Sequence, residues 1–136
     1  MIKKLSRALL VLVCILLGAC ASTPERIVIQ VSDDHQGTWG QALNVARNLK
    51  SAYGPGNAEI ELVAFGSGIN MLKADALVAT RVLETANAGV KIYACENSMK
   101  RFKLNRDDMV ENMTYVEAGI AHIIARHREG WFVDRP

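Results

Sequence analysis

The chain has 136 residues, of which 50% are hydrophobic, 16 are basic and 14 are acidic, for a formal net charge of +2. This length and composition predict at most one domain, large enough to bury an apolar core. There is no basic stripe and no cluster of Lys and Arg interleaved with aromatic residues, which argues against a nucleic-acid partner.

The N-terminus has the pattern of a secretory signal. Residues 1–7 contain three cations, and an uninterrupted apolar run over residues 8–19 follows. That run is too short to span a bilayer comfortably, which favours a removable signal peptide over residues 1–19. Removing these three cations from the 16 basic residues leaves 13 against 14 acidic ones. The mature protein is therefore expected to be close to neutral.

The end of this signal, Leu17-Gly18-Ala19-Cys20, resembles the lipobox of bacterial lipoproteins, and a polar spacer follows it. The resemblance implies cleavage before Cys20 and lipid attachment to Cys20. With Ala21 after the cysteine, it also implies the periplasmic face of the outer membrane. Several acyl chains on one residue would anchor residues 20–25 stably at the membrane. The alternatives are an ordinary signal peptide with an incidental cysteine, or a single transmembrane anchor.

Residues 26–136 predict one domain in which strands and helices alternate. Strands that are almost entirely apolar and β-branched are typical of a parallel sheet covered on both faces, and apolar residues at helical spacing mark the helices between them. This alternation predicts an α/β fold, a three-layer α/β/α sandwich on a parallel sheet of about five strands. In chain order we expect strand 27–31, helix 39–53, strand 59–65, a long helix over 72–86, strand 90–94, a short helix over 97–103, a helical turn from residue 105, strand 114–116, a last helix marked by residues 116, 120, 123 and 124 and ended by Gly130, and strand 131–133.

Cys95 is the residue on which the functional interpretation depends. It stands where a buried strand gives way to a helix, and Glu96, Asn97 and Ser98 suit the first turn of that helix. Unpaired amides and partial positive charge at a helix N-terminus favour a thiolate and lower the pKa of a thiol. A neighbouring carboxylate, that of Glu96, acts in the opposite direction. We expect a thiolate at an accessible edge of the sheet; the alternative is a small apolar filler at a strand end.

The number of cysteines makes this thiol unusual. With Cys14 removed and Cys20 lipidated, Cys95 has no partner for an intramolecular disulfide in an oxidising compartment. Parallel strands finish at one edge of a sheet, so His35 and Ser67 should share that edge with Cys95. We predict His35 as a base and Ser67 as a hydrogen-bond donor at the site. A solvated loop residue is the alternative for His35.

No cofactor or metal is expected from the sequence motifs. Gly66-Ser67-Gly68 begins a dinucleotide-like run, but Met71 occupies the position of the third glycine. Two carboxylates in the first loop disfavour a flavin mononucleotide phosphate there. His122 and His127 lie five residues apart on a helix and do not share a face, so they do not form a metal site. Arg126 is expected to be a charge on the helix surface.

Five segments carry a family resemblance, and they are Ser32-Asp33-Asp34, residues 42–48, residues 62–66, residues 93–99 and the C-terminal region from Ala118 to Trp131. Together they resemble the DsrE/DsrF-like family, which is named for intracellular sulfur oxidation. The resemblance implies an α/β/α fold with a parallel sheet of five strands and frequent homo-oligomers. In some members it also implies a cysteine that accepts and passes sulfane sulfur as a persulfide, and Cys95 falls where that cysteine would be expected. The characterised sulfur relays are cytoplasmic, whereas this chain carries an export signal.

We therefore expect a periplasmic, membrane-anchored sulfur carrier or thiol-exchange protein that acts through a persulfide on Cys95. Its activity would be sulfur transfer of the sulfurtransferase type. Its expected partners are further copies of itself, a thiol or persulfide protein, and the membrane through the lipid on Cys20. One alternative is a non-catalytic module that binds a small ligand or a protein, with Cys95 structural. Another is a structural subunit that the lipid presents at the membrane.

Overall fold

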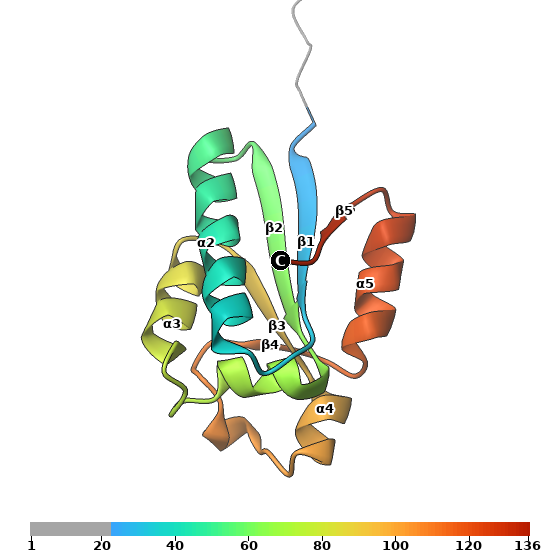
Figure 1. The fold of residues 1–136 in the computed structure, drawn as a ribbon. Helices are drawn as coiled ribbons and strands as arrows, with labels where there is room; N and C mark the ends of the chain where they lie inside the picture. The colour runs from blue at the N-terminus through green and yellow to red at the C-terminus, as the bar shows by residue number, and fades with distance from the viewer. Residues whose placement is uncertain (1–22) are drawn as a thin grey trace, which may run out of the picture.

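The computed structural model describes residues 23–136, so the predicted signal peptide and Cys20 lie outside the described residues. In this part of the chain, five parallel strands form one sheet in the order β4-β3-β2-β1-β5. Figure 1 shows α2 and α3 on one side of the sheet and α5 on the other, which confirms the predicted α/β/α architecture. The strands are β1 (Glu25–Val31), β2 (Ala58–Ala64), β3 (Lys91–Cys95), β4 (Thr114–Val116) and β5 (Phe132–Asp134); the α-helices are α2 (Gln36–Tyr53), α3 (Ala79–Asn87), α4 (Glu96–Arg101) and α5 (Gly119–Arg128); the 3-10 helices are η1 (Gly66–Leu72) and η2 (Arg106–Asp108).

The core has two parts, one on each face of the sheet. Alternate residues of each strand point to opposite faces, so strands buried on both sides need apolar residues at almost every position. The larger part lies under α2, α3 and η1 and receives most of the buried aliphatic side chains. The part under α5 is small, and its buried members are Val28, Val63, Tyr93, Ile123 and Trp131.

The long helix predicted over residues 72–86 is wrong in its first half. The 3-10 helix η1 ends at Leu72, and α3 begins only at Ala79. The backbone between them pairs with a distant segment: the Ala74 amide donates to the Asp108 carbonyl, and the Val110 amide donates to the Leu72 carbonyl, each at 2.8 Å. Groups committed to these bonds are not available to an α-helical ladder.

Gly66-Ser67-Gly68 opens η1, where the chain passes close to the end of β1. A Cβ atom on Gly68 would collide with the Val31 carbonyl group, since it would lie 2.7 Å from the carbonyl carbon. Gly66 has a φ of 56°, which favours glycine. These glycines therefore serve a close backbone approach, and this approach holds η1 at the edge of the sheet where the strands end.

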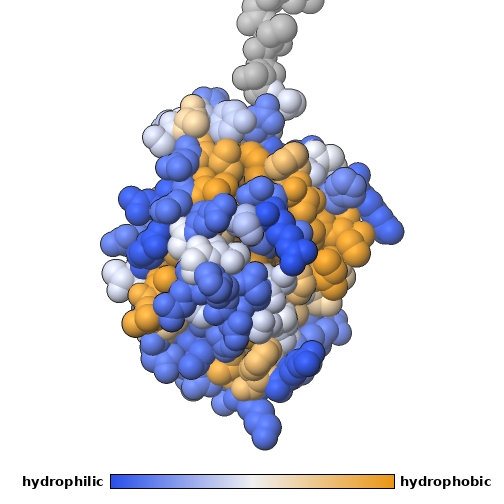
Figure 2. All heavy atoms as spheres, in the orientation of Figure 1, coloured by the Kyte–Doolittle hydropathy of each residue, from blue (hydrophilic) through white to orange (hydrophobic). Residues whose placement is uncertain are grey.

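Apolar side chains remain exposed beside β5. Phe132 is 67% exposed and lines a groove of about 440 Å³ together with Leu49 and Tyr53 of α2. Figure 2 shows apolar residues gathered on this side of the molecule, between α2 and α5. None of the helices in residues 23–136 combines the length and apolar character needed to cross a membrane.

Candidate functional site around Cys95

Cys95 is the last residue of β3 and the N-cap of α4, so the predicted strand-to-helix junction is confirmed. Along β3, Ile92 and Ala94 belong to the core under α2 and α3, whereas Tyr93 belongs to the core under α5. Because side chains alternate along a strand, Cys95 lies on the same face as Tyr93. Its sulfur is therefore directed toward the start of α5.

The first residue of α5, Gly119, donates its amide hydrogen to the sulfur of Cys95, with 3.3 Å between N and Sγ. The thiol hydrogen has an acceptor in the Glu117 carbonyl, at 3.8 Å from Sγ. Amides in the first turn of a helix have no partner within the helix and carry partial positive charge. The sulfur thus lies at the starts of two helices. Cys95 is itself the N-cap of α4, and the first amide of α5 donates to its sulfur.

A side chain at residue 119 would be crowded. A Cβ there would lie 3.0 Å from Cβ of Phe65, 3.2 Å from Cγ1 of Val63 and 3.3 Å from Cβ of Cys95. These neighbours are fixed to strands or to the chain directly after one, so they cannot move aside as the end of a long side chain would. The missing side chain lets the start of α5 sit directly against the sheet and against the sulfur.

Ser98, in the first turn of α4, is a further polar residue that acts on the sulfur. Its Oγ accepts from the Gly66 amide at 2.8 Å, and its hydroxyl is one of the groups that lower the pKa of Cys95. Burial raises the pKa of the Cys95 thiol, but hydrogen bonds from the Ser98 hydroxyl and from the amides of Gly119 and Ser98 lower it further than burial raises it. The net result is a pKa below that of an ordinary cysteine, so the thiolate is favoured.

The expectation of an accessible thiol is wrong. Cys95 is only 4% exposed because α5 begins directly against it. The expected influence of Glu96 is also reduced, because its carboxylate forms an ion pair with Arg106 at 2.9 Å. The sulfur is therefore enclosed yet surrounded by hydrogen-bond donors, which differs from both the accessible thiolate and the apolar filler.

His35 and Ser67 follow β1 and β2, so they lie at the same edge of the sheet as Cys95. Their hydrogen bonds within the described residues go elsewhere, however. Nδ1 of His35 accepts from the Gly37 amide at 3.2 Å and caps α2. The Ser67 hydroxyl donates to the Ser32 carbonyl at 3.3 Å. The catalytic roles predicted for His35 and Ser67 stay predictions.

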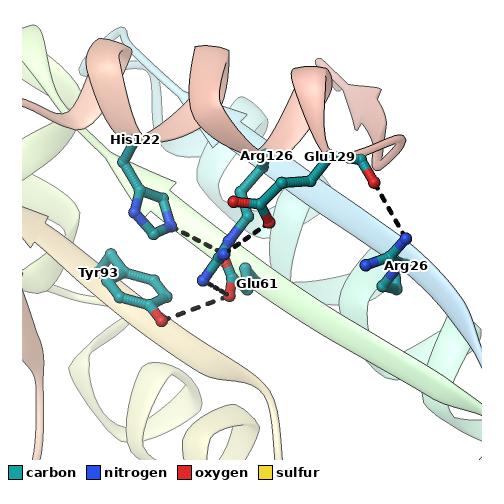
Figure 3. Close-up of polar contacts among 6 residues, drawn as sticks. All are labelled: Arg26, Glu61, Tyr93, His122, Arg126 and Glu129. Carbon is teal, nitrogen blue, oxygen red and sulfur yellow. Dashed lines mark hydrogen bonds and ion pairs between the residues drawn. The ribbon is translucent and has the colours of Figure 1, made fainter.

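A buried polar cluster lies under α5, on the same face of the sheet as Cys95 (Figure 3). Glu61 of β2 is 1% exposed, and both of its oxygens are bonded. Arg126 donates from Nε to Oε2 and from Nη2 to Oε1, both at 2.9 Å. His122 Nε2 lies 2.7 Å from Oε2, and the Tyr93 hydroxyl donates to Oε1 at 3.3 Å. Arg126 is thus bound to the sheet and is not the helix-surface charge expected from the sequence.

Electrostatics in this cluster favour the ionised carboxylate. Burial raises the pKa of Glu61, and the hydrogen bonds from Arg126 and His122 outweigh this and bring it below the usual value. The pKa of Tyr93 is raised, first by burial and then by the Glu61 charge. The sequence did contain a signal for this cluster: Glu61 stands in the middle of an apolar strand predicted to be covered on both faces, where a carboxylate needs a buried partner.

In the described part of the chain, neither a metal site nor the groove beside α3 includes Cys95. Within residues 23–136, no group of three or more His, Cys, Asp and Glu side chains is arranged to hold a metal ion. A groove of about 770 Å³ lies between α3 and the segment of residues 106–115, and Cys95 is not among the residues that line it.

Comparison with known proteins agrees with the fold and shows the family. The family model described as the DsrE/DsrF-like family matches residues 25–130. The chain is similar to the solved structure of a protein of unknown function, MTH1491 from Methanobacterium thermoautotrophicum, with 30% sequence identity and a TM-score of 0.77 over 82% of this chain and 99% of that one. It also shares its fold with BT1422, a conserved protein of unknown function from Bacteroides thetaiotaomicron, with 20% identity and a TM-score of 0.68 over 82% of this chain and 95% of that one. No curated protein matches the chain.

Proposed function

Because the chain belongs to the DsrE/DsrF-like family, we propose that it is a sulfur carrier in which Cys95 accepts a sulfane sulfur atom and passes it on as a persulfide. The observation that carries this proposal is the position of Sγ at the starts of α4 and α5, where the Gly119 amide donates to it at 3.3 Å. A thiolate, not a thiol, is the nucleophile in such chemistry.

The reaction needs no external oxidant or reductant. The Cys95 thiolate attacks a sulfane sulfur of a polysulfide, a new S–S bond forms at Sγ, and the S–S bond behind the attacked atom breaks. The departing polysulfide, one sulfur shorter, carries away the electron pair and takes up a proton from water. An acceptor thiolate then attacks the outer sulfur of the persulfide, and Cys95 leaves as the thiolate that began the cycle.

The burial of Cys95 favours a small donor. At 4% exposure the sulfur cannot meet a folded partner protein without movement of the chain around Gly119. Inorganic polysulfide is small and anionic, so the same donors that favour the thiolate also suit the incoming sulfur. We therefore place inorganic polysulfide first among the candidate donors.

Intact-mass analysis tests this proposal. The purified protein is exposed to polysulfide at neutral pH, and we expect a mass gain of one or more sulfur atoms that disappears after reduction. Cys95→Ser is the matched control and should show no gain, since it keeps a side chain of similar size but has no thiol. A wild-type protein that gains no sulfur, or a serine variant that gains as much, would contradict the proposal.

A second candidate function is a non-catalytic binding module, which the low exposure of Cys95 favours. In that case a ligand would occupy a surface groove, such as the one of about 770 Å³ beside α3, and Cys95 would only pack. The Cys95→Ser variant separates the two functions, because a binding module keeps its ligand while a sulfur carrier loses the acceptor thiol of Cys95.

We further infer a lipid anchor on Cys20, supported by the lipobox-like sequence over residues 17–20. The anchor would hold the domain at the periplasmic face of the outer membrane, where it would act as a homo-oligomer. Membrane fractionation of a Cys20→Ala variant tests the anchor: the wild type should sediment with the membrane and the variant should not. Equal amounts of both in the membrane fraction would refute lipidation at this residue.

A further inference from the structure

The polar cluster under α5 joins three elements through one carboxylate. Glu61 of β2 is bonded to two side chains of α5, at Arg126 and His122, which lie one turn apart. It also accepts from Tyr93 of β3. Two contacts on consecutive turns fix both the position and the rotation of a helix, whereas a single contact would leave it free to pivot.

Helix α5 has few apolar contacts that could replace this clamp. Its buried residues are Gly119 and Ile123, and Gly119 contributes no side chain. Ile120 and Ile124 are 49% and 45% exposed. The polar bonds to Glu61 must therefore contribute a large part of what holds α5 against the sheet.

The clamp and the candidate site are directly connected. His122 is three residues after Gly119, so about 4.5 Å of helix separates the clamp from the amide that donates to Sγ. On the strand side, Tyr93 is two residues before Cys95 on the same face, and its ring packs on that of His122 with 4.4 Å between centroids. Figure 3 shows Tyr93 and His122 converging on Glu61 from β3 and α5.

From this geometry we propose that Glu61 is a positioning residue for Cys95: by holding His122 and Arg126, it keeps the Gly119 amide on the sulfur. It does not touch the reacting atoms. The inference rests on the proposed function, because it takes the Cys95 thiolate as the nucleophile. Its test measures ionisation of the thiol and does not require sulfur transfer.

The experiment compares Glu61→Gln with Glu129→Gln. Both variants remove a carboxylate that is bonded to Arg126, but the Glu129 side chain bonds Nη1 of Arg126 on the exposed side of α5, at 2.9 Å, and does not reach the sheet. The readout is alkylation at Cys95 across a pH series, followed by mass spectrometry. The variants are compared by the pH at the midpoint of the alkylation profile. The absolute alkylation rate is not used, because a loosened α5 would also let the reagent reach Cys95 faster.

We expect the midpoint to rise by about half to one pH unit in Glu61→Gln and to stay at the wild-type value in Glu129→Gln. A Glu61→Gln variant that melts at a lower temperature but keeps the wild-type midpoint would overturn the inference, since Glu61 would then serve stability alone.

A second pair keeps the test decisive if Glu61→Gln fails to fold. His122→Gln retains an N–H donor near the position of Nε2, whereas His122→Leu removes it. We expect the leucine variant to raise the Cys95 midpoint and the glutamine variant to restore it; no change in either would also overturn the inference. The two proposals can fail separately. If the wild-type protein takes up no polysulfide sulfur but the variants still shift the Cys95 midpoint as expected, the proposed function is refuted and the role of Glu61 stands.

Discussion

The hydrogen bond from α5 to the sulfur of Cys95 depends on Gly119, a neighbour that has no side chain. The Gly119 amide reaches Sγ at 3.3 Å because nothing lies between α5 and the strands at that point. A methyl group there would press on the β-carbons of Phe65 and Cys95, which the backbone holds in place.

Gly119→Ala should therefore destabilise the protein, although alanine is the better helix residue. We expect a loss of about 1–3 kcal/mol in the free energy of unfolding, together with a higher alkylation midpoint for Cys95. Gly40→Ala is the control, because a Cβ there would meet only Nη1 of Arg81 at an ordinary 3.5 Å. The control should gain about 0.5–1 kcal/mol from helix propensity. A gain of the same size in Gly119→Ala would mean that α5 shifts freely and does not fix the amide.

For single residues, the sequence predicts the secondary-structure element in which a residue lies, but not the residues that its side chain contacts. The place of Cys95 at a strand end followed from the apolar run before it and the capping residues after it. The choice between Ser67 and Ser98 as the hydroxyl near the sulfur depends on how η1 folds over the strand ends, which no local pattern specifies. The partner of Arg126 is 65 residues away in the sequence, so helical periodicity alone placed this side chain on the surface.

Among the elements, η1 tolerates the fewest substitutions on steric grounds. It brings the Gly66 amide to Ser98 and passes so close to β1 that Gly68 has no room for a Cβ. Residues 66–71 lay between the predicted strand 59–65 and the predicted helix 72–86, and no helix was expected there because Gly66 and Gly68 are also turn residues. The long helix predicted from residue 72 failed for a related reason: the apolar spacing continues, but backbone pairing with residues 108–110 prevents helix formation before Ala79.

Gly68→Ala tests this close approach of η1 to β1. The added Cβ would lie 2.7 Å from the Val31 carbonyl carbon and 3.0 Å from the Ser32 amide nitrogen, both of them backbone atoms. We expect a loss of about 2–4 kcal/mol in chemical denaturation. Ser67→Ala, which removes one hydroxyl bond to Ser32, should cost only about 0.5–1.5 kcal/mol. Equal costs for the two variants would show that η1 can move away from β1.

At the scale of the whole molecule, the five parallel strands and the two helical layers agree with the prediction, because they follow from alternating apolar strands and helices. The strand order β4-β3-β2-β1-β5 was not predicted. The two faces differ in a way the pattern did not indicate: one is covered by α2, α3 and η1, the other mainly by α5 and its polar cluster. A large share of the stability of the α5 face should consequently depend on pH.

The sign of this pH dependence follows from Glu61. Its pKa is lowered in the folded protein, so its stabilising contribution is fully present above the pKa of an unfolded glutamate, about 4.3, and is lost as the pH falls through the lower folded-state value. At pH 7 we expect the wild type to exceed Glu61→Gln by about 2–4 kcal/mol in the free energy of unfolding. Urea denaturation at a series of pH values should show this difference shrinking below about pH 4. A difference that stays constant down to acid pH would contradict the ionised cluster.

We propose that backbone and hydroxyl donors hold the enclosed sulfur of Cys95 as a thiolate that is ready to accept sulfur. The most direct measurement is the initial rate of persulfide formation at Cys95 as a function of pH, with polysulfide as donor and intact mass as the readout. We predict a rate that rises with a midpoint clearly below the ordinary cysteine value of about 8.5 and that is absent in Cys95→Ser. A midpoint at or above that value, or no persulfide at any pH, would contradict it.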